Sequence, residues 1–328
     1  MALSIVTAAD HPEIFTRWRD VDGRFPVNST VRYGAFARHY YSIAFANSRR
    51  DASFAVVDRD APRLLVMATI GAGHLDYYGS PARLFRADPD DEAAIAAAFA
   101  HLDGLMESDS VRNAAIVDAA PAGLLSPIGE ACLNRHFRPS LHLTAWADIS
   151  EGELSLRRGL RKSYKSLLNW GKTNMVISVV NQEAPDRAQF DRYRAFHHAV
   201  AGRAVRAQDT WDAFYSWIEA GHAELVLGSL PDGELVAGTM VGDAAGSAYY
   251  LSGVYDRERF DKPMAHWPLW VAMLRARERG VLRFELGDVP LEGTATPKEV
   301  AIGFFKRGFA TEIVTSLVWT RTDPSTAG

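Results

Sequence analysis

The sequence predicts an α/β protein, of the α+β kind, built from two similar units in tandem. Two observations support this fold class. The order of predicted elements in residues 1–150 returns in residues 151–328, and short alternating stretches, typical of strands, are interspersed with longer stretches of helical period. With 328 residues, of which 48% are hydrophobic, the chain is long enough to bury two cores.

The first half begins with helices and continues with a hairpin, a strand, a helix, a strand, a helix and a strand. Residues 9–47 read as one or two aromatic-rich helices, interrupted by the turn-like residues 22–30. The acidic residues 88–92 start a further helix, because negative charge is favourable at a helix N-terminus. The predicted strands are 53–58, 64–70, 75–79, 114–117 and 141–146, and the later helices are 88–106 and 122–134.

The second half repeats this order in a fuller form. It reads as a strand, two helices, three meander strands, and then helix, strand, helix and strand. The turn Pro-Asp-Gly at 231–233 joins two of the meander strands. The predicted strands are 176–180, 224–228, 235–241, 247–254, 282–286 and 312–319, and the predicted helices are 187–200, 210–221, 267–279 and 299–307.

Residues 261–288 contain an amphipathic helix that leads directly into a strand. Pro268 suits a first helical turn, and Gly280 can adopt the left-handed conformation that ends a helix. Asp288 places a carboxylate at the C-terminal end of the strand, where open sheets bind ligands. The apolar stripe of the helix, spaced i, i+3, i+4 and i+7, consists of Trp267, Trp270, Val271 and Leu274.

Composition excludes several classes of protein. The net charge of -4 argues against an extended nucleic-acid surface, although a local basic patch is compatible with it. A single cysteine, Cys132, excludes an internal disulfide and a four-cysteine metal site, and it fits a reducing compartment. The N-terminus has no signal-peptide pattern, and no apolar run reaches the roughly 18 residues of a membrane span. We therefore expect a cytoplasmic protein without a membrane span.

Three stretches carry a family resemblance: LRRGLRKSYKSLLNWGK at 156–172, HWPLWVAMLRARERGVLRFELGD at 266–288 and KEVAIGFFKRGFATE at 298–312. They are similar to the basic helix, the late helix and strand, and the lysine–aromatic segment of FemAB-like proteins. The chain thus resembles the FemAB-like branch of the GNAT acyltransferase superfamily. The resemblance implies two tandem GNAT-like units, each a mixed, mostly antiparallel sheet flanked by helices. Residues 1–150 would form a degenerate unit, and residues 151–328 an acyltransferase unit with a basic entry helix.

The same resemblance implies a bacterial-type N-acyltransferase that moves an acyl group from acetyl-CoA or another acyl-CoA to an amino group. The implied acceptor is a small amine, such as an amino sugar or another precursor of the cell envelope or of a polysaccharide. Aminoacyl-tRNA, the donor of FemAB enzymes that extend peptidoglycan bridges, is an alternative donor. A non-catalytic ligand-binding module on the same fold is a third possibility, because a fold does not fix a function.

In GNAT folds the donor slot lies where the fourth and fifth strands diverge, which here implies residues 247–254 against 281–286. Donor phosphates would meet the N-terminus of the following helix, whose amides attract anions. The usual R/Q-x-x-G-x-G/A turn is not matched, since no glycine follows Gly253 before that helix, and this keeps the tRNA donor open. The implied donor-binding residues are Tyr250, Ser252, Gly253, Arg257, Arg259 and Lys262. A solvated charged loop is the alternative interpretation of these charges.

The basic segment, residues 156–172, is predicted as one helix with a uniformly cationic face. No acidic residue occurs between Glu153 and Glu183, so a phosphate partner would relieve the repulsion along this face. The alternative is an ordinary interdomain helix that pairs with acids elsewhere. The cations of the face are Arg157, Arg158, Arg161, Lys162 and Lys165. For a nucleotide-linked or phosphorylated acceptor, or for tRNA, the resemblance suggests Arg161, Lys162, Tyr164, Lys165 and Lys306 as binding residues.

Three residues are candidates for proton transfer. Asp288 ends the strand beside the implied slot, where a carboxylate can hold an ammonium group and accept its proton. Glu285 shares a strand face with Arg283, so a structural ion pair is an equal alternative. His266 has a suitable intrinsic pKa, but a histidine before a helix is more often a cap or a core contact. Lys306 could stabilise negative charge, or could only favour a helix C-terminus.

Other motifs do not support a different chemistry. The glycines of GAGHLD at 71–76 lack the third glycine of a dinucleotide fingerprint. His197 and His198 are adjacent and would point to different sides of a helix, so they make a poor metal pair. No paired-cysteine motif, H-E-x-x-H motif or G-x-S-x-G motif occurs, and no metal site is predicted.

Overall fold

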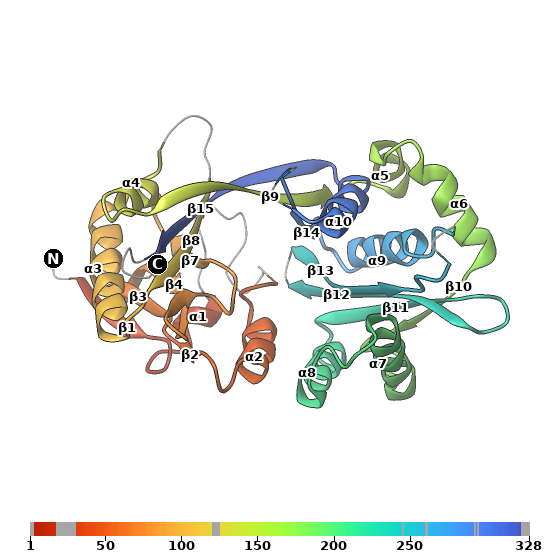
Figure 1. Cartoon of the computed structure of the whole chain (residues 1–328), viewed down its shortest axis with the longest axis horizontal. Helices are drawn as coiled ribbons and strands as arrows, with labels where there is room; N and C mark the ends of the chain where they lie inside the picture. The colour runs from red at the N-terminus through yellow and green to blue at the C-terminus, as the bar shows by residue number, and fades with distance from the viewer. Residues whose placement is uncertain are drawn as a thin grey trace. The chain divides into compact units, whose positions relative to one another are not determined.

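The structure is a computed structural model that describes residues 3–17, 31–119, 125–244, 246–259, 262–291, 293 and 295–322. The chain forms two compact units, which can be followed by colour in Figure 1. Unit 1 contains residues 1–143 and 315–328, and unit 2 contains residues 144–314. The chain passes between the units in two long strands, β9 (Arg138–Asp148) and β15 (Glu312–Thr322).

Unit 1 consists of β1 (Leu3–Thr7), α1 (Ile14–Arg17), α2 (Ala35–Ala44), β2 (Arg50–Asp51), β3 (Phe54–Asp58), β4 (Ala61–Met67), β5 (Thr69–Gly71), β6 (His74–Asp76), β7 (Ala82–Arg86), α3 (Glu92–Ser108), β8 (Asn113–Ala119), α4 (Pro127–Leu133) and the ends of β9 and β15. The strand order is β1, β3, β4, β7, β8 and β15. Among the described strand pairs of this unit, two are parallel: β6 with β8, and β7 with β8. The predicted turn at 22–30 lies outside the described residues.

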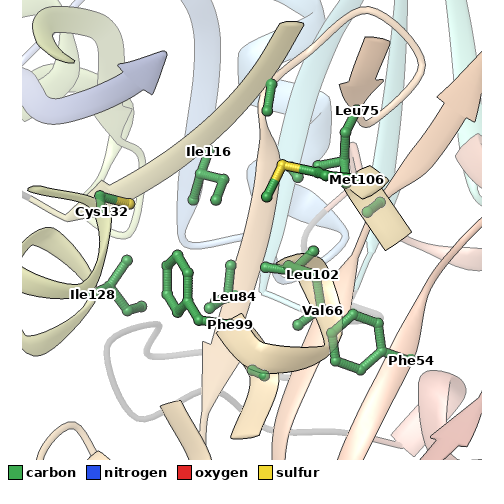
Figure 2. Packing of buried hydrophobic residues seen from close by; sticks show 14 of the residues in the cluster. Phe54, Val66, Leu75, Leu84, Phe99, Leu102, Met106, Ile116, Ile128 and Cys132 are labelled. Carbon is green, nitrogen blue, oxygen red and sulfur yellow. The ribbon is translucent and has the colours of Figure 1, made fainter. Parts of the chain in front are cut away.

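The core of unit 1 lies between its sheet and α3 (Figure 2). Alternate residues of β3 point to opposite faces, so Phe54 packs towards α3 while Ala55 joins a second apolar cluster on the other face. The side chain of Asp91 caps α3 by accepting a hydrogen bond from the amide of Ala94 at 3.1 Å. Labelled members of the main cluster in Figure 2 are Phe54, Val66, Leu84, Phe99, Leu102, Ile116 and Cys132.

Unit 2 consists of α5 (Glu153–Gly159), α6 (Tyr164–Asn174), β10 (Val176–Val180), α7 (Arg187–Ala201), α8 (Gln208–Glu219), β11 (Ala223–Ser229), β12 (Leu235–Ala244), β13 (Ser247–Tyr255), α9 (His266–Glu278), β14 (Arg283–Val289), α10 (Pro297–Arg307) and parts of β9 and β15. The strand order is β9, β14, β13, β12, β11 and β10. Helices α7 and α8 cover one face of the sheet and α9 covers the other, with α6 packed on α9 (Figure 1). The predicted fold class is confirmed, and so is the predicted order of elements from β10 onward. In unit 1, the strands β1 and β7 were not predicted.

The predicted helix at 267–279 is present as α9, but its predicted apolar stripe is wrong. Of the four stripe residues only Trp270 is buried, whereas Leu269 and Met273 are buried as well. The reason is that α9 packs against β11 and β12 on one side and against α6 on another, so no single stripe defines its buried surface. The contact with α6 is close: a Cβ added to Gly171 would lie 2.3 Å from Trp267 Cβ.

The predicted uninterrupted helix of the basic segment is also wrong. Helix α5 ends at Gly159, Leu160 is extended with a ψ angle of 149°, and α6 begins at Tyr164. The amide of Arg161 donates a hydrogen bond to the carbonyl of Gly308 at 3.0 Å instead of continuing the helix. A tertiary contact with the end of α10 therefore divides the segment, and its cations do not share one helical face.

A buried carboxylate anchors the C-terminal half of α9 to the sheet. The Glu224 side chain, on β11, is only 3% exposed and accepts two hydrogen bonds from Arg275 at 2.7 and 2.8 Å. Arg279 lies 3.1 Å from Oε2 of the same carboxylate and also binds Asp243 at 2.7 Å. Because a buried charge is costly unless it is paired, this network fixes α9 relative to β11 and β12.

Replacing Glu224 with glutamine is expected to lower the free energy of unfolding by about 2 kcal/mol, because two partly exposed guanidinium groups lose a buried anionic partner. Urea denaturation followed by circular dichroism measures the change. The matched control is Asp212→Asn, which removes an exposed acid paired with Arg187 and should change stability by less than about 0.5 kcal/mol. Equal effects of the two substitutions would contradict the anchoring role of Glu224.

Candidate functional site

The strands β13 and β14 pair for only three residues and then separate. Their parallel register runs from Ser247 opposite Arg283 to Tyr249 opposite Glu285. A β-bulge in the β12–β13 ladder follows at once, because Met240 pairs with Ser252 and Val241 with Tyr250, which leaves Leu251 as the extra residue. Residues 250–255 of β13 and 286–289 of β14 are called the strand divergence below.

Two of the implied donor-binding residues are packed together within β13. A Cβ added to Gly253 would lie 1.7 Å from the hydroxyl oxygen of Tyr250, so no larger residue fits at position 253 without displacement of the tyrosine. Burial raises the pKa of the Tyr250 phenol far above its usual range, which keeps it protonated. The predicted pair Tyr250 and Gly253 thus lies at the strand divergence as one packed unit.

The C-terminal end of β14 brings Asp288 and Lys306 together. The Lys306 ammonium group, from α10, donates a hydrogen bond to the Asp288 carbonyl at 3.0 Å. Gly287 permits this approach, because it has a φ of 90° and a Cβ there would lie 2.9 Å from Lys306 Nζ. Asp288 itself is exposed. A carboxylate and an ammonium group therefore lie at the strand divergence.

Glu285 has a different environment from Asp288. It is buried, with 9% of its surface exposed, and lies opposite Tyr249 in the last parallel pair. Its predicted ion-pair partner, Arg283, instead forms an ion pair with Glu312 and lies over the Trp146 ring at 4.6 Å. Arg283 therefore joins β14 to its neighbouring strands, while Glu285 lies in the last parallel pair, directly before the strand divergence.

His266 lies within an aromatic cluster at the start of α9. Its ring is 4.6 Å from Tyr164, 5.1 Å from Phe305 and 5.9 Å from Phe309. Burial lowers the pKa of His266 to about 4, and the nearby positive charge of Arg161 acts in the same direction. The ring is therefore neutral at pH 7, and its contacts favour the packing role over proton transfer.

The cations of the basic segment separate into different environments. Arg161 lies 3.5 Å above the ring of Phe304 and donates a hydrogen bond to the Tyr164 hydroxyl, which in turn donates to the Phe305 carbonyl at 3.1 Å. Lys162 is exposed in the connection between the helices, and Lys165 is half-buried on α6. Arg161 and Tyr164 thus join the cluster around His266.

The segment before α9 offers fewer phosphate ligands than the resemblance implies. Arg259 is paired with Glu234 at 2.7 Å and with Asp256 at 3.2 Å, whereas Arg257 and Lys262 are exposed. The His266 amide donates to the Pro263 carbonyl at 3.2 Å, and Pro268 has no amide hydrogen. The first turn of α9 is therefore a poor anion cradle.

Sequence reasoning missed one group of polar residues that the structure brings together on the α7 side of β13. His197 lies beside Ser252, with 3.4 Å between Nε2 and Oγ, and Ser252 accepts a hydrogen bond from the Tyr193 hydroxyl at 3.0 Å. No local sequence pattern indicates this contact, because it joins a helix to a remote strand. In the described part of the chain, no three His, Cys, Asp or Glu residues are arranged to hold a metal ion.

Unit 1 contains a similar strand arrangement that is closed by an ion pair. Its parallel pair, β7 with β8, ends at Arg83 opposite Val117. Beyond this point Arg86 and Asp118, both with 4% of the side chain exposed, join the two strands at 3.6 Å. Burial raises the pKa of Asp118, although a hydrogen bond with Ser126 and the charge of Arg86 oppose this shift.

Comparisons with known proteins agree with this geometry. No protein-family model matches the chain, and no curated protein matches it. Among solved structures, FemX matches with a TM-score of 0.67 at 12% identity, covering 97% of each chain. A tandem GNAT protein from the clavulanic acid biosynthesis pathway matches with a TM-score of 0.57 at 15% identity, covering 98% of each chain. L-PGS from Bacillus licheniformis matches with a TM-score of 0.56 at 12% identity, covering 86% of this chain and 87% of its own.

These likenesses define the class of fold: the chain has the tandem GNAT fold of FemAB-like proteins, as the sequence motifs indicated. At 12 to 15% identity the likeness establishes the fold alone. Within the described residues, no helix combines the length and the apolar character that a membrane crossing requires.

The stability of the protein is expected to fall as the pH decreases from about 6.5 to about 4, partly because of His266. Its folded-state pKa of about 4 is lower than that of the unfolded chain, so the unfolded state binds a proton first in this window. Urea denaturation of the wild type and of His266→Gln at several pH values measures the effect, and the variant should show a shallower decline.

Above about pH 7.5, His266 is neutral in both the folded and the unfolded wild-type protein. The difference in free energy of unfolding between the wild type and His266→Gln then reflects packing alone. That comparison is the internal control. Parallel stability profiles across the whole range would show that His266 is not held neutral by its surroundings.

Proposed function

We propose that unit 2 is an N-acyltransferase that transfers an acyl group from acyl-CoA to the amino group of a small acceptor. The acceptor class is an amino sugar or another precursor of the cell envelope or of a polysaccharide. The observation that carries this proposal is the strand divergence, where β13 and β14 separate after Tyr249 and Glu285. Solved structures of the same fold include FemX and a tandem GNAT protein, which supports acyl transfer.

The strand divergence can bind the extended arm of a donor. Residues 250–255 pair with β12 on one side, and their parallel register with β14 has ended. Backbone amides and carbonyls on that side can pair with an extended ligand that carries amide groups, in the manner of an added strand. Tyr250 and Gly253 form the packed surface behind this edge. Arg257 and Lys262 are exposed and lie between this strand and α9, where they could contact donor phosphates.

The proposed reaction is a direct transfer. The uncharged acceptor nitrogen attacks the thioester carbonyl carbon, a C–N bond forms and the C–S bond breaks. The thiolate leaves and takes up the proton that the nitrogen loses when it becomes an amide. Asp288 holds the acceptor ammonium group and accepts the proton that it must lose. Lys306, beside Asp288, stabilises negative charge as it develops on the carbonyl oxygen or the leaving group. Glu285 is the second candidate base.

Aminoacyl-tRNA is a second candidate donor, because two observations favour it. The first turn of α9 offers few amides for a pyrophosphate, since the His266 amide is already bonded and Pro268 has none. The basic segment has no acidic residue, and its exposed cations Arg158 and Lys162 can contact a phosphate backbone. In this case the same strand divergence would receive the aminoacyl ester.

We infer that unit 1 is degenerate as a catalytic unit. The buried ion pair between Arg86 and Asp118 lies beyond the last parallel pair of β7 and β8. An ion pair that joins both strands leaves less room there for a donor than the strand divergence of unit 2 does. If unit 2 uses no donor either, the chain is a ligand-binding module without catalytic activity.

Asp288→Asn is expected to lower turnover about a hundredfold with acetyl-CoA and an amine acceptor, because a base in the transition state is lost. Donor affinity should stay the same. Lys306 contacts the backbone carbonyl of Asp288, so the substitution preserves that hydrogen bond. Steady-state kinetics with a panel of amino sugars, together with calorimetric titration of acetyl-CoA, measures both quantities.

The matched control is Asp191→Asn, an exposed acid on α7 that pairs with Arg187, and it should leave turnover unchanged. An unaltered rate in Asp288→Asn would remove Asp288 from the mechanism. Turnover with charged tRNA alone, with binding that weakens steeply as salt increases, would replace the CoA donor by the tRNA donor. If the protein bound neither donor, a non-catalytic ligand-binding module would be the remaining function.

A further inference from the structure

The side chain of Tyr193, on α7, is enclosed against the strand β12. It is fully buried, and a Cβ added to Gly238 would lie 2.6 Å from two of its ring carbons. The rings of Trp211 and Phe190 also contact it, with centroids 5.9 and 6.4 Å away. Because protein interiors are close-packed, a ring enclosed in this way has little freedom to move.

The hydroxyl of Tyr193 reaches the neighbouring strand, β13, at its bulge. It donates a hydrogen bond to Ser252 Oγ at 3.0 Å, and Ser252 is only 8% exposed. Ser252 directly follows the bulged residue Leu251, and Gly238 pairs with Val254, two residues further along β13. Tyr193 therefore contacts both strands of the β12–β13 ladder at the point where its register changes.

His197, one turn further along α7, is the second neighbour of the Ser252 hydroxyl. Its Nε2 lies 3.4 Å from Ser252 Oγ. Burial lowers the pKa of His197 to about 4, so the ring is neutral at pH 7 and can accept a hydrogen bond. Since Ser252 accepts from Tyr193, its own hydroxyl hydrogen is available to donate to Nε2. Two residues of α7 thus hold one side chain of β13.

The hydrogen bond from Tyr193 distinguishes the bulged register from the regular one. If the pairing before the bulge continued unchanged, Ser252 would lie opposite Thr239 instead of Met240. A shift of one residue turns each side chain to the other face of the sheet, so Leu251 would point towards α7 and Ser252 away from it. The buried Tyr193 hydroxyl would then lose its partner, which costs free energy. The contact therefore stabilises the bulged register.

We propose that Tyr193 is a positioning residue of the acyltransferase, which aligns the donor by holding β13 in its bulged register through Ser252. Residues 250–255, proposed above as the donor edge, span this bulge. In the shifted register the amides and carbonyls that follow the bulge would exchange sides, and those on the β14 side would turn towards β12. An extended donor could not pair with them there. The role rests on the acyltransferase function proposed above, and it needs no contact between Tyr193 and a substrate.

Tyr193→Phe tests the role, because it removes the hydroxyl and keeps the ring against Gly238. We expect the amides of residues 250–255 to exchange faster in the donor-free protein, since the register is held less firmly. The Kd for acetyl-CoA should rise about tenfold, whereas the acceptor KM should change less than about twofold. Hydrogen exchange by mass spectrometry, calorimetric titration and steady-state kinetics measure the three quantities.

Ser252→Ala examines the same contact from the other strand. It should weaken acetyl-CoA binding to a similar extent as Tyr193→Phe. The double variant should bind about as weakly as the weaker single variant, because both substitutions remove one shared hydrogen bond. Fully additive losses would show that the two side chains act independently and would contradict the proposal.

The matched control is Tyr215→Phe, on α8. Tyr215 is also buried, and its ring lies 5.2 Å from that of Phe190, but no hydrogen bond in the described part of the chain joins its hydroxyl to β13. This variant should leave both exchange in residues 250–255 and acetyl-CoA binding unchanged. Unchanged exchange and binding in Tyr193→Phe, or equal losses in Tyr215→Phe, would overturn the positioning role.

Failure of this role is distinguishable from failure of the proposed function. Faster exchange of residues 250–255 in Tyr193→Phe, in a protein that uses no donor, would refute the transferase and with it the donor alignment. Tyr193 would then remain only as the residue that holds the register. Acyl transfer by the wild type, with unchanged exchange and unchanged donor affinity in Tyr193→Phe, would refute the positioning role and leave the transferase in place.

Discussion

The arrangement of unit 2 depends on one constraint in β13. This strand pairs with β12 from Ser247 to Tyr255, but its parallel register with β14 ends at Tyr249. The bulge at Leu251 makes the change possible, because an extra residue bends the strand and redirects the side chains that follow. Ser252 is thereby placed against α7. Among the described residues, no strand pairs with the edge of β13 beyond Tyr249 on the β14 side. The proposed donor and acceptor positions both follow from this change.

The surrounding elements hold this geometry in place from both faces of the sheet. On one face, the carboxylate of Glu224 anchors Arg275 and Arg279, which fixes α9 over β11 and β12. On the other, Tyr193 ties α7 to Ser252. Unit 1 differs at the corresponding position: Arg86 and Asp118 form an ion pair that joins β7 and β8 beyond their last parallel pair. The two units share an order of elements, but they differ in the side chains that follow the last parallel pair.

Local patterns were sufficient to predict most elements, because strand alternation, helical period and turn residues act over short distances. Gly280 ends α9 as expected, with a φ of 86°. Tertiary contacts could not be predicted from these local patterns. The break after Gly159 depends on the hydrogen bond from Arg161 to the distant Gly308. Asp288 and Lys306 were both candidates, but their contact required the fold, and the His197–Ser252 contact was missed because it joins a helix to a remote strand.

The proposed donor site of unit 2 is the strand divergence. Hydrogen exchange measured by mass spectrometry, with and without acetyl-CoA, tests it most directly, since bound backbone amides exchange more slowly. We expect slower exchange in residues 250–255 and 286–289 and unchanged exchange in β7 and β8 of unit 1. Unaltered exchange in both strands of unit 2, or protection confined to β7 and β8, would contradict it.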